Sequence, residues 1–87
     1  MENNDSFITN DKIYAPFLLA CSLNGHLTFI KTHIQTNVVY FEFSPRKKAM
    51  ELIDKFAVGL DPDVPFKDIF YAQEVFWRKV YEAKNSC

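Results

Sequence analysis

The chain of 87 residues has few of the residues from which common ligand sites are built. Its only glycines, Gly25 and Gly59, stand where helices are expected to end, so it has no glycine-rich phosphate loop. Its two cysteines, Cys21 and Cys87, lack the spacing of a metal site or a redox motif. The apolar run at residues 13–21 is far shorter than the ~20 residues that cross a membrane. We expect no cofactor, no metal ligands, no small-molecule substrate and no membrane partner.

The chain also lacks an excess of charge of one sign. The chain has ten lysines and arginines and 11 acidic residues, for a net charge of −1. Its overall electrostatic field therefore does not favour binding to nucleic acid or to a membrane, although a local charged patch could still do so. The acidic start at residues 1–5 does not resemble the basic start of an export signal, which predicts a cytoplasmic protein. Association would help a chain this short, because it buries only about 60–65% of its unfolded surface.

Apolar residues are abundant, at 48% of the chain, with nine phenylalanines, four tyrosines and one tryptophan. They predict a real core in a single α+β domain, ordered α-β-β-α-α, with a two-stranded antiparallel hairpin packed on helices. Residues 1–9 are expected to be a flexible tail and residues 10–84 the domain. The first helix is expected to begin at Asn10 or Asp11 and to end at Asn24. Its uncharged interior predicts burial on several sides, and Pro16 requires a late start or a kink.

Two strands are predicted, at residues 26–34 and 38–43, and Asn37 suits the turn between them because it tolerates positive φ. Alternation places Val39, Phe41 and Phe43 on one face of the second strand. In the first strand, the same alternation places Leu27 and Phe29 on one face, and Ile30 and Ile34 on the other face. A ribbon that is apolar on both faces is unstable alone, so helices or a second copy must cover it.

Two further helices are predicted, at about residues 45–58 and 65–83. Ser44 is expected to cap the first of them, with Pro45 at its first helical position. An apolar stripe that includes Leu52 and Phe56 makes this helix amphipathic. The last helix carries apolar side chains over about half its circumference, more than the ~100° that a surface helix needs. It is therefore either central to the core or part of an interface.

At a set of mostly apolar positions, the chain resembles a family of short prokaryotic and phage-type domains of unknown function. The resemblance covers residues 9–82 and rests on a Thr-x-Asp-like element, an alanine-rich helix, a Val-x-Phe-x-Phe hairpin and an aromatic closing helix. The matching residues are Thr9, Asp11, Ala15, Leu18, Ala20, Val39, Phe41, Phe43, Phe66, Ala72, Phe76 and Tyr81. The resemblance implies a small domain of phage-like origin and brings no functional residues with it.

The residues that could support catalysis do not form a recognisable catalytic set, and we expect that the protein is not an enzyme. His26 and His33 are expected on opposite faces of a strand and cannot share a metal. Cys21 lies in an uncharged helix, where burial would raise its pKa and leave it inert. Asp61 and Asp63 lack the other ligands of a calcium loop, and Asp63 is better explained as a helix cap.

Arg46, Lys47 and Lys48 are unusual because three cations in the first turn of a helix oppose its dipole. A phosphate group over the helix start would relieve this conflict, and Arg78 and Lys79 could add a second contact beside aromatic rings. These five residues are the predicted contacts of a weak nucleic-acid binder. The competing interpretation is a solvated face, in which salt screens the charges.

The surplus of apolar surface leads to a different hypothesis, in which the chain binds a protein partner or a second copy of itself. The predicted interface residues are Tyr40, Phe70, Trp77 and Tyr81, at the hairpin edge and on the last helix. Complete burial within one chain remains the alternative. The preferred prediction is a non-enzymatic interaction module, with nucleic-acid binding as the second choice.

Overall fold

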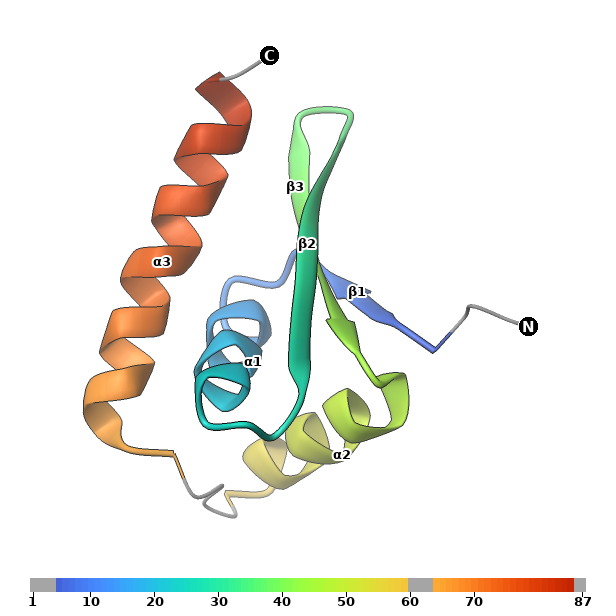
Figure 1. Ribbon diagram of the computed structural model, residues 1–87, viewed down its shortest axis with the longest axis vertical. Helices are drawn as coiled ribbons and strands as arrows, with labels where there is room; N and C mark the ends of the chain where they lie inside the picture. Colours follow the sequence, from blue (N-terminus) through green and yellow to red (C-terminus); the bar gives the residue numbers. More distant parts are fainter. Residues whose placement is uncertain (1–4, 60–63, 86–87) are drawn as a thin grey trace.

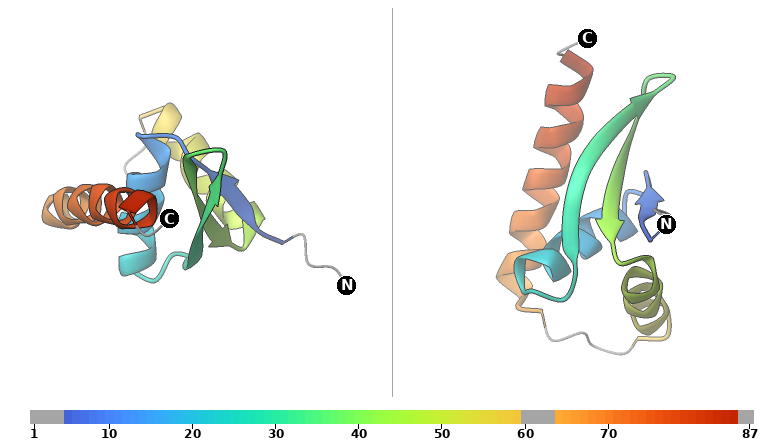
Figure 2. Two further views of the ribbon diagram at one scale, coloured as in Figure 1. Left: turned by 90° about the horizontal axis from the view of Figure 1, so that it is seen from above. Right: turned by 45° about the vertical axis from the view of Figure 1, so that its right-hand side comes forward.

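The computed structural model describes residues 5–59 and 64–85, and it forms a small compact α+β domain (Figure 1). Three helices accompany a three-stranded antiparallel sheet in which the strands lie in the order β1-β3-β2. The views in Figure 2 show α1 between the sheet and the first half of α3, with α2 at one end of the sheet. The second half of α3 packs directly on β2 and β3. Along the chain the elements are β1 (Phe7–Thr9), α1 (Tyr14–Leu23), β2 (Thr28–Gln35), β3 (Val38–Ser44), α2 (Arg46–Ala57) and α3 (Phe66–Asn85).

The third strand, β1, corrects the expected two-stranded hairpin, because it forms from residues predicted to be a flexible tail. Phe7 is the Cα partner of Phe43, and Thr9 is the partner of Phe41. Phe7 is half-buried and packs against the core. A strand of three residues is too short to show an alternation of period two, which explains why the sequence pattern did not indicate it.

Helix α1 begins three residues later than Asp11, which is consistent with the late start required by Pro16. An oxygen of the Asp11 carboxylate accepts hydrogen bonds from the backbone N–H groups of Ile13 and Tyr14, at 2.7 and 2.9 Å. Asp11 therefore satisfies donors at the helix start although it lies before the helix. Pro16 occupies the third position of the helix, where a backbone donor is not needed for an intrahelical bond.

The core surrounds α1, which confirms the predicted burial of this helix on several sides. All seven residues from Ala15 to Cys21 are buried. The sheet covers one side of α1 with Val39, Phe41 and Phe43, and α3 covers another side with Ala72 and Phe76. The predicted inner face of β3 is thus confirmed, with side chains that are at most 5% exposed.

A β-bulge in β2 changes the faces predicted for that strand. Phe29 pairs with Phe43, but the register shifts before Lys31, which pairs with Glu42. Because one extra residue reverses the alternation, Ile34 pairs with Val39 and lies on the same face as Phe29 rather than the opposite one.

The turn between β2 and β3 is formed by Thr36 and Asn37, and both have positive φ, of 54° and 64°. This combination is that of a two-residue type I′ hairpin turn, and it confirms the conformation predicted for Asn37. Thr36 is energetically unfavourable at this position, because a β-branched side chain disfavours the left-handed backbone conformation.

Helix α2 covers the predicted span, but its start differs from the predicted cap. Ser44 still belongs to β3, where it pairs with Thr28, so its side chain does not cap the helix. Pro45 is the capping residue instead of the first helical one. The first helical N–H, that of Arg46, donates to the carbonyl oxygen of Asp5 at 3.2 Å. The predicted cap of α3, Asp63, lies outside the described residues.

Candidate functional site

A line of exposed aromatic side chains runs along the outer face of α3. The line consists of four residues, Phe66, Phe70, Trp77 and Tyr81. At 100° per residue, their positions fall within a sector of about 60° of the helix circumference. Their exposed fractions range from 53% to 73%, although large aromatic side chains are usually well buried. We call this surface the aromatic stripe, and it consists of Phe66, Phe70, Trp77 and Tyr81.

The stripe is exposed because the opposite face of α3 is the one that packs into the core. Ala72 and Phe76 are buried there, and Phe76 stacks on Phe41 with ring centroids 4.9 Å apart. The two halves of the stripe are also ordered. Trp77 makes an edge-to-face contact with Phe76 at 4.9 Å, and Phe66 lies 5.2 Å from Phe70. These contacts fix rings on the surface without burying them.

A shallow hollow lies between the two central rings of the stripe. Phe70 and Trp77 line it together with Lys67, Tyr71, Gln73, Glu74 and Arg78. The hollow is open to solvent, so it suits a flat contact with another macromolecule better than a small molecule that must be enclosed.

The fourth predicted interface residue, Tyr40, does not belong to this surface. Its neighbour Phe41 points into the core, and alternation along β3 therefore places Tyr40 on the outer face of the sheet, opposite His33. The sheet and α1 separate this face from α3 (Figure 2). The structure thus brings Phe70, Trp77 and Tyr81 together and leaves Tyr40 apart.

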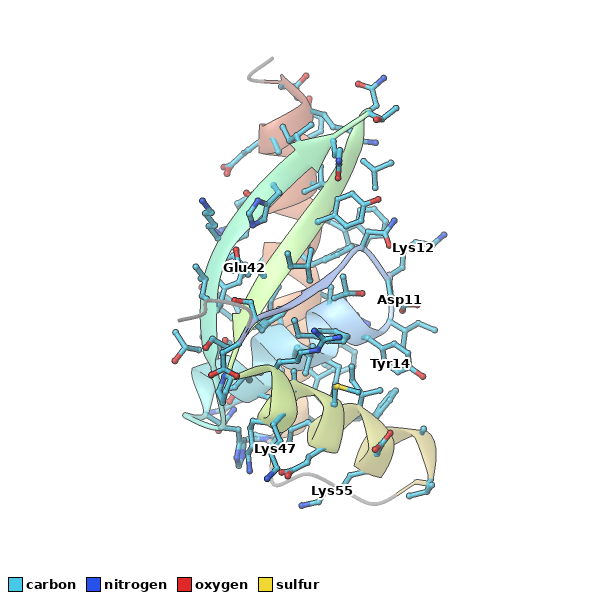
Figure 3. All side chains as sticks on the ribbon, turned by 90° about the vertical axis from the view of Figure 1, so that its right-hand side faces the viewer. Asp11, Lys12, Tyr14, Glu42, Lys47 and Lys55 are labelled. Atoms are coloured by element: carbon cyan, nitrogen blue, oxygen red, sulfur yellow. The ribbon has the colours of Figure 1, made fainter. Side chains whose placement is uncertain are left out.

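The predicted basic contacts are also divided between distant places. Arg46 and Lys47 are exposed at the start of α2, and Figure 3 shows Lys47 projecting away from the helix. Lys48 is half-buried. Desolvation raises the pKa of the buried Cys21 thiol, and the positive charge of Lys48 acts in the opposite direction. The N–H of Arg46 already has a carbonyl partner, so it is not available to a phosphate.

Arg78 and Lys79 do not extend this basic group, because they lie on α3 and not on α2. Arg78 is exposed beside the hollow of the stripe. Lys79 turns toward the core, and its Nζ lies over the ring of Phe29, 5.2 Å from the centroid. The amine of Lys79 is therefore used within the domain.

The outer face of the sheet carries a polar cluster that the sequence pattern did not indicate. Nε2 of His33 lies 2.6 Å from Oε1 of Glu42, and Glu42 also accepts a hydrogen bond from Ser6 (Figure 3 labels Glu42). The hydrogen bonds from Ser6 and then His33 hold the pKa of the Glu42 carboxyl below its ordinary value of 4.5. The bulge brings His33 and Glu42 together, so spacing alone could not reveal the pair.

This cluster is not the arrangement of a catalytic triad. In a triad, the imidazole stands between the nucleophile and the carboxylate, whereas here the carboxylate of Glu42 stands between Ser6 and His33. The only cysteine among the described residues, Cys21, is buried, and desolvation raises its pKa to about 12. This agrees with the inert thiol predicted for it. Within residues 5–59 and 64–85, no group of three or more His, Cys, Asp or Glu side chains could hold a metal ion.

Within the part of the chain that the structure describes, no helix combines the length and the apolar character needed to cross a membrane. Comparison with protein-family models, with curated proteins and with solved structures found no match for this chain. The resemblance to short prokaryotic and phage-type domains therefore stays a prediction from the residues that carry it.

Proposed function

We propose that this protein is a non-enzymatic interaction module that associates with a second copy of itself through the aromatic stripe of α3. The observation that carries the proposal is the alignment of four exposed aromatic side chains on the face of α3 that the core does not use. Single exposed apolar residues are common, but several large ones aligned on one face are typical of an interaction site.

The area of the stripe is sufficient for a specific contact. Aromatic side chains of ~150–250 Å² that are more than half exposed leave roughly 500 Å² of apolar surface on each chain. Two chains then bury about 1,000 Å² from the stripe alone, which is near the lower limit for a biological interface. Contacts at the rim add to this area, so we expect reversible association at micromolar concentration.

The outer edge of β2 is the other surface at which two copies could join, and it receives less support. The bulge between Phe29 and Lys31 interrupts the regular row of backbone groups, and Lys31 places a charge there. Both features are common ways in which proteins prevent pairing between edge strands.

The single tryptophan allows a direct test, because Trp77 belongs to the stripe and reports on it alone. We expect its fluorescence to shift to shorter wavelength, and acrylamide quenching to weaken, as protein concentration rises. Light scattering should show a mass of twice the 10.2 kDa chain at the same concentrations. A single-chain mass with quenching independent of concentration would contradict self-association.

Matched variants connect the association to the stripe. Trp77→Ser removes a stripe residue, whereas Met50→Ser removes an apolar side chain that is 48% exposed on α2, away from the stripe. The first variant should be monomeric at concentrations where the second still dimerises, and both should keep the circular dichroism spectrum of the native chain. Equal weakening by both variants would refute the assignment of the surface.

Nucleic-acid binding through Arg46, Lys47 and Lys48 is the alternative function, and the geometry supports it less. Of these three residues only Arg46 and Lys47 are exposed, and neither Arg78 nor Lys79 adds to their surface. Fluorescence anisotropy of labelled oligonucleotides separates the two functions. Binding that weakens steeply with salt and disappears when the three residues are replaced by alanine would support the alternative.

A further inference from the structure

The aromatic stripe has the same spacing in both directions along α3. Its members are separated by four, seven and four residues, so the pattern is symmetric about the point between Gln73 and Glu74. A second copy that runs in the opposite direction therefore sets its Trp77 against Phe70, and its Tyr81 against Phe66. Every aromatic ring of the stripe then meets an aromatic ring of the other chain.

We propose that two copies pack α3 against α3 in antiparallel orientation, with a twofold axis between Gln73 and Glu74. This inference rests on the proposed self-association and specifies its geometry. A twofold interface uses the same patch on both chains, which requires a self-complementary surface, and the symmetric spacing supplies one. The outermost position of α3 in the domain leaves this face accessible to a helix of another chain (Figure 2).

The charges and dipoles favour the antiparallel arrangement over the parallel one. Antiparallel helices place the positive end of each dipole beside the negative end of the other. Lys84 lies on the line of the stripe, about one turn beyond Tyr81 toward the end of α3. In a parallel pair the two Lys84 side chains would oppose each other, whereas an antiparallel pair separates them by about 32 Å, at 1.5 Å per residue.

The polar residues at the centre of the stripe are compatible with the twofold axis. Gln73 lies on one flank, where it faces the Gln73 of the second copy. Two amide groups can pair there, because each both donates and accepts. Glu74 lies on the other flank, and Arg78 follows it by one turn on the same flank. Arginines from both chains therefore balance the two carboxylates that approach each other near the axis.

Cross-linking of single-cysteine variants tests the orientation. In a Cys87→Ser background, the remaining native thiol, Cys21, is fully buried. Gln73→Cys places a thiol beside the axis, and Lys84→Cys places one at the far end of the stripe. We expect a short bismaleimide to join two Gln73→Cys chains efficiently and two Lys84→Cys chains hardly at all. Light scattering and circular dichroism confirm beforehand that both variants are folded dimers.

Each outcome of the experiment has a distinct meaning. Efficient cross-linking of Lys84→Cys would overturn the antiparallel orientation while keeping the association on α3. A dimer that cross-links at neither position would overturn the inference and indicate another surface, such as the outer edge of β2. A monomer in every variant, and in the native chain, would overturn the proposed self-association itself.

The twofold axis also determines how strongly a single substitution weakens the dimer. Because of the twofold axis, a single substitution removes two contacts from each dimer. Phe70→Ser should raise the dissociation constant roughly a thousandfold, since a central aromatic residue contributes about 30-fold at each of its two places. Met50→Ser, on α2 and outside the stripe, should change it less than about threefold. Similar dissociation constants for the two variants would refute the central position of Phe70.

Discussion

Glu42→Gln is expected to lower the free energy of unfolding at neutral pH and to have little effect in acid. The carboxylate of Glu42 accepts hydrogen bonds from Ser6 and His33 on the outer face of the sheet, and its side chain is only 16% exposed. These bonds stabilise the ionised form, so the pKa of Glu42 is lower in the folded protein than its ordinary value of 4.5. Glutamine has nearly the same shape and keeps one oxygen as an acceptor but loses the charge.

The size of the effect follows from the difference between charged and neutral hydrogen bonds. A bond to a charged group contributes about 1.5–3 kcal/mol and a neutral one about 0.5–1.5 kcal/mol. Two partly accessible bonds that lose their charge should therefore cost about 1–2 kcal/mol at neutral pH. For a domain of this size, each kcal/mol corresponds to roughly 4–8 °C in melting temperature.

The sign of the pH dependence is fixed by the direction of the shift. Because the folded pKa is the lower one, the stabilisation is complete above the ordinary value of 4.5. It is lost as the pH falls through the folded pKa, where Glu42 of the native chain takes up a proton. The native chain should therefore lose its advantage over Glu42→Gln as the pH falls below 4.5 and through the folded pKa.

Urea unfolding followed by circular dichroism, at neutral pH and at an acidic pH below the folded pKa of Glu42, measures both quantities. Glu82→Gln, an isosteric change at an exposed position of α3, is the control and should alter stability by less than about 0.5 kcal/mol. The reasoning would be refuted if native chain and Glu42→Gln differed by the same free energy at both pH values, because the charge of Glu42 would then not be the cause.

Two further predictions concern the hairpin turn and the start of α2. The double substitution Thr36→Asn and Asn37→Gly should raise the melting temperature by several degrees, since these residues accept the positive φ values of the turn, and a decrease would show that the turn is not strained. Lys47→Gln and Lys55→Gln each remove a cation four residues from Glu51, but in the first and last turns of α2. Lys47→Gln should be more stable than Lys55→Gln by about 0.6–2 kcal/mol in urea unfolding, and equal stabilities would exclude a dipole effect.

Much of the fold could be predicted where a local pattern is long enough to be unambiguous. The alternation of Val39, Phe41 and Phe43 identified the inner face of β3, and the uncharged interior of α1 indicated its central position. The width of the apolar arc on α3 indicated more apolar surface than the core requires, and Phe70 is one of the residues that remain exposed.

The features that sequence reasoning missed depend on contacts between distant segments. Strand β1 has three residues, and it is a strand because β3 offers an unpaired edge beside it. Ser44 is a favourable capping residue, but the ladder with Thr28 keeps it in the sheet. The pairing of His33 with Glu42 requires the bulge in β2, and one extra residue in a strand has no signature in periodicity.

The aromatic stripe is not explained by the stability of the single chain. Ala72 allows α3 to approach α1, and Phe76 fills the space against Phe41, so the core closes without any stripe residue. Keeping large apolar rings in water gives no stability, and it increases the tendency of a small protein to aggregate. Four such rings in a symmetric line are therefore best explained by a contact that covers them. The symmetry itself favours a partner with the same pattern, and a second copy of this chain has it.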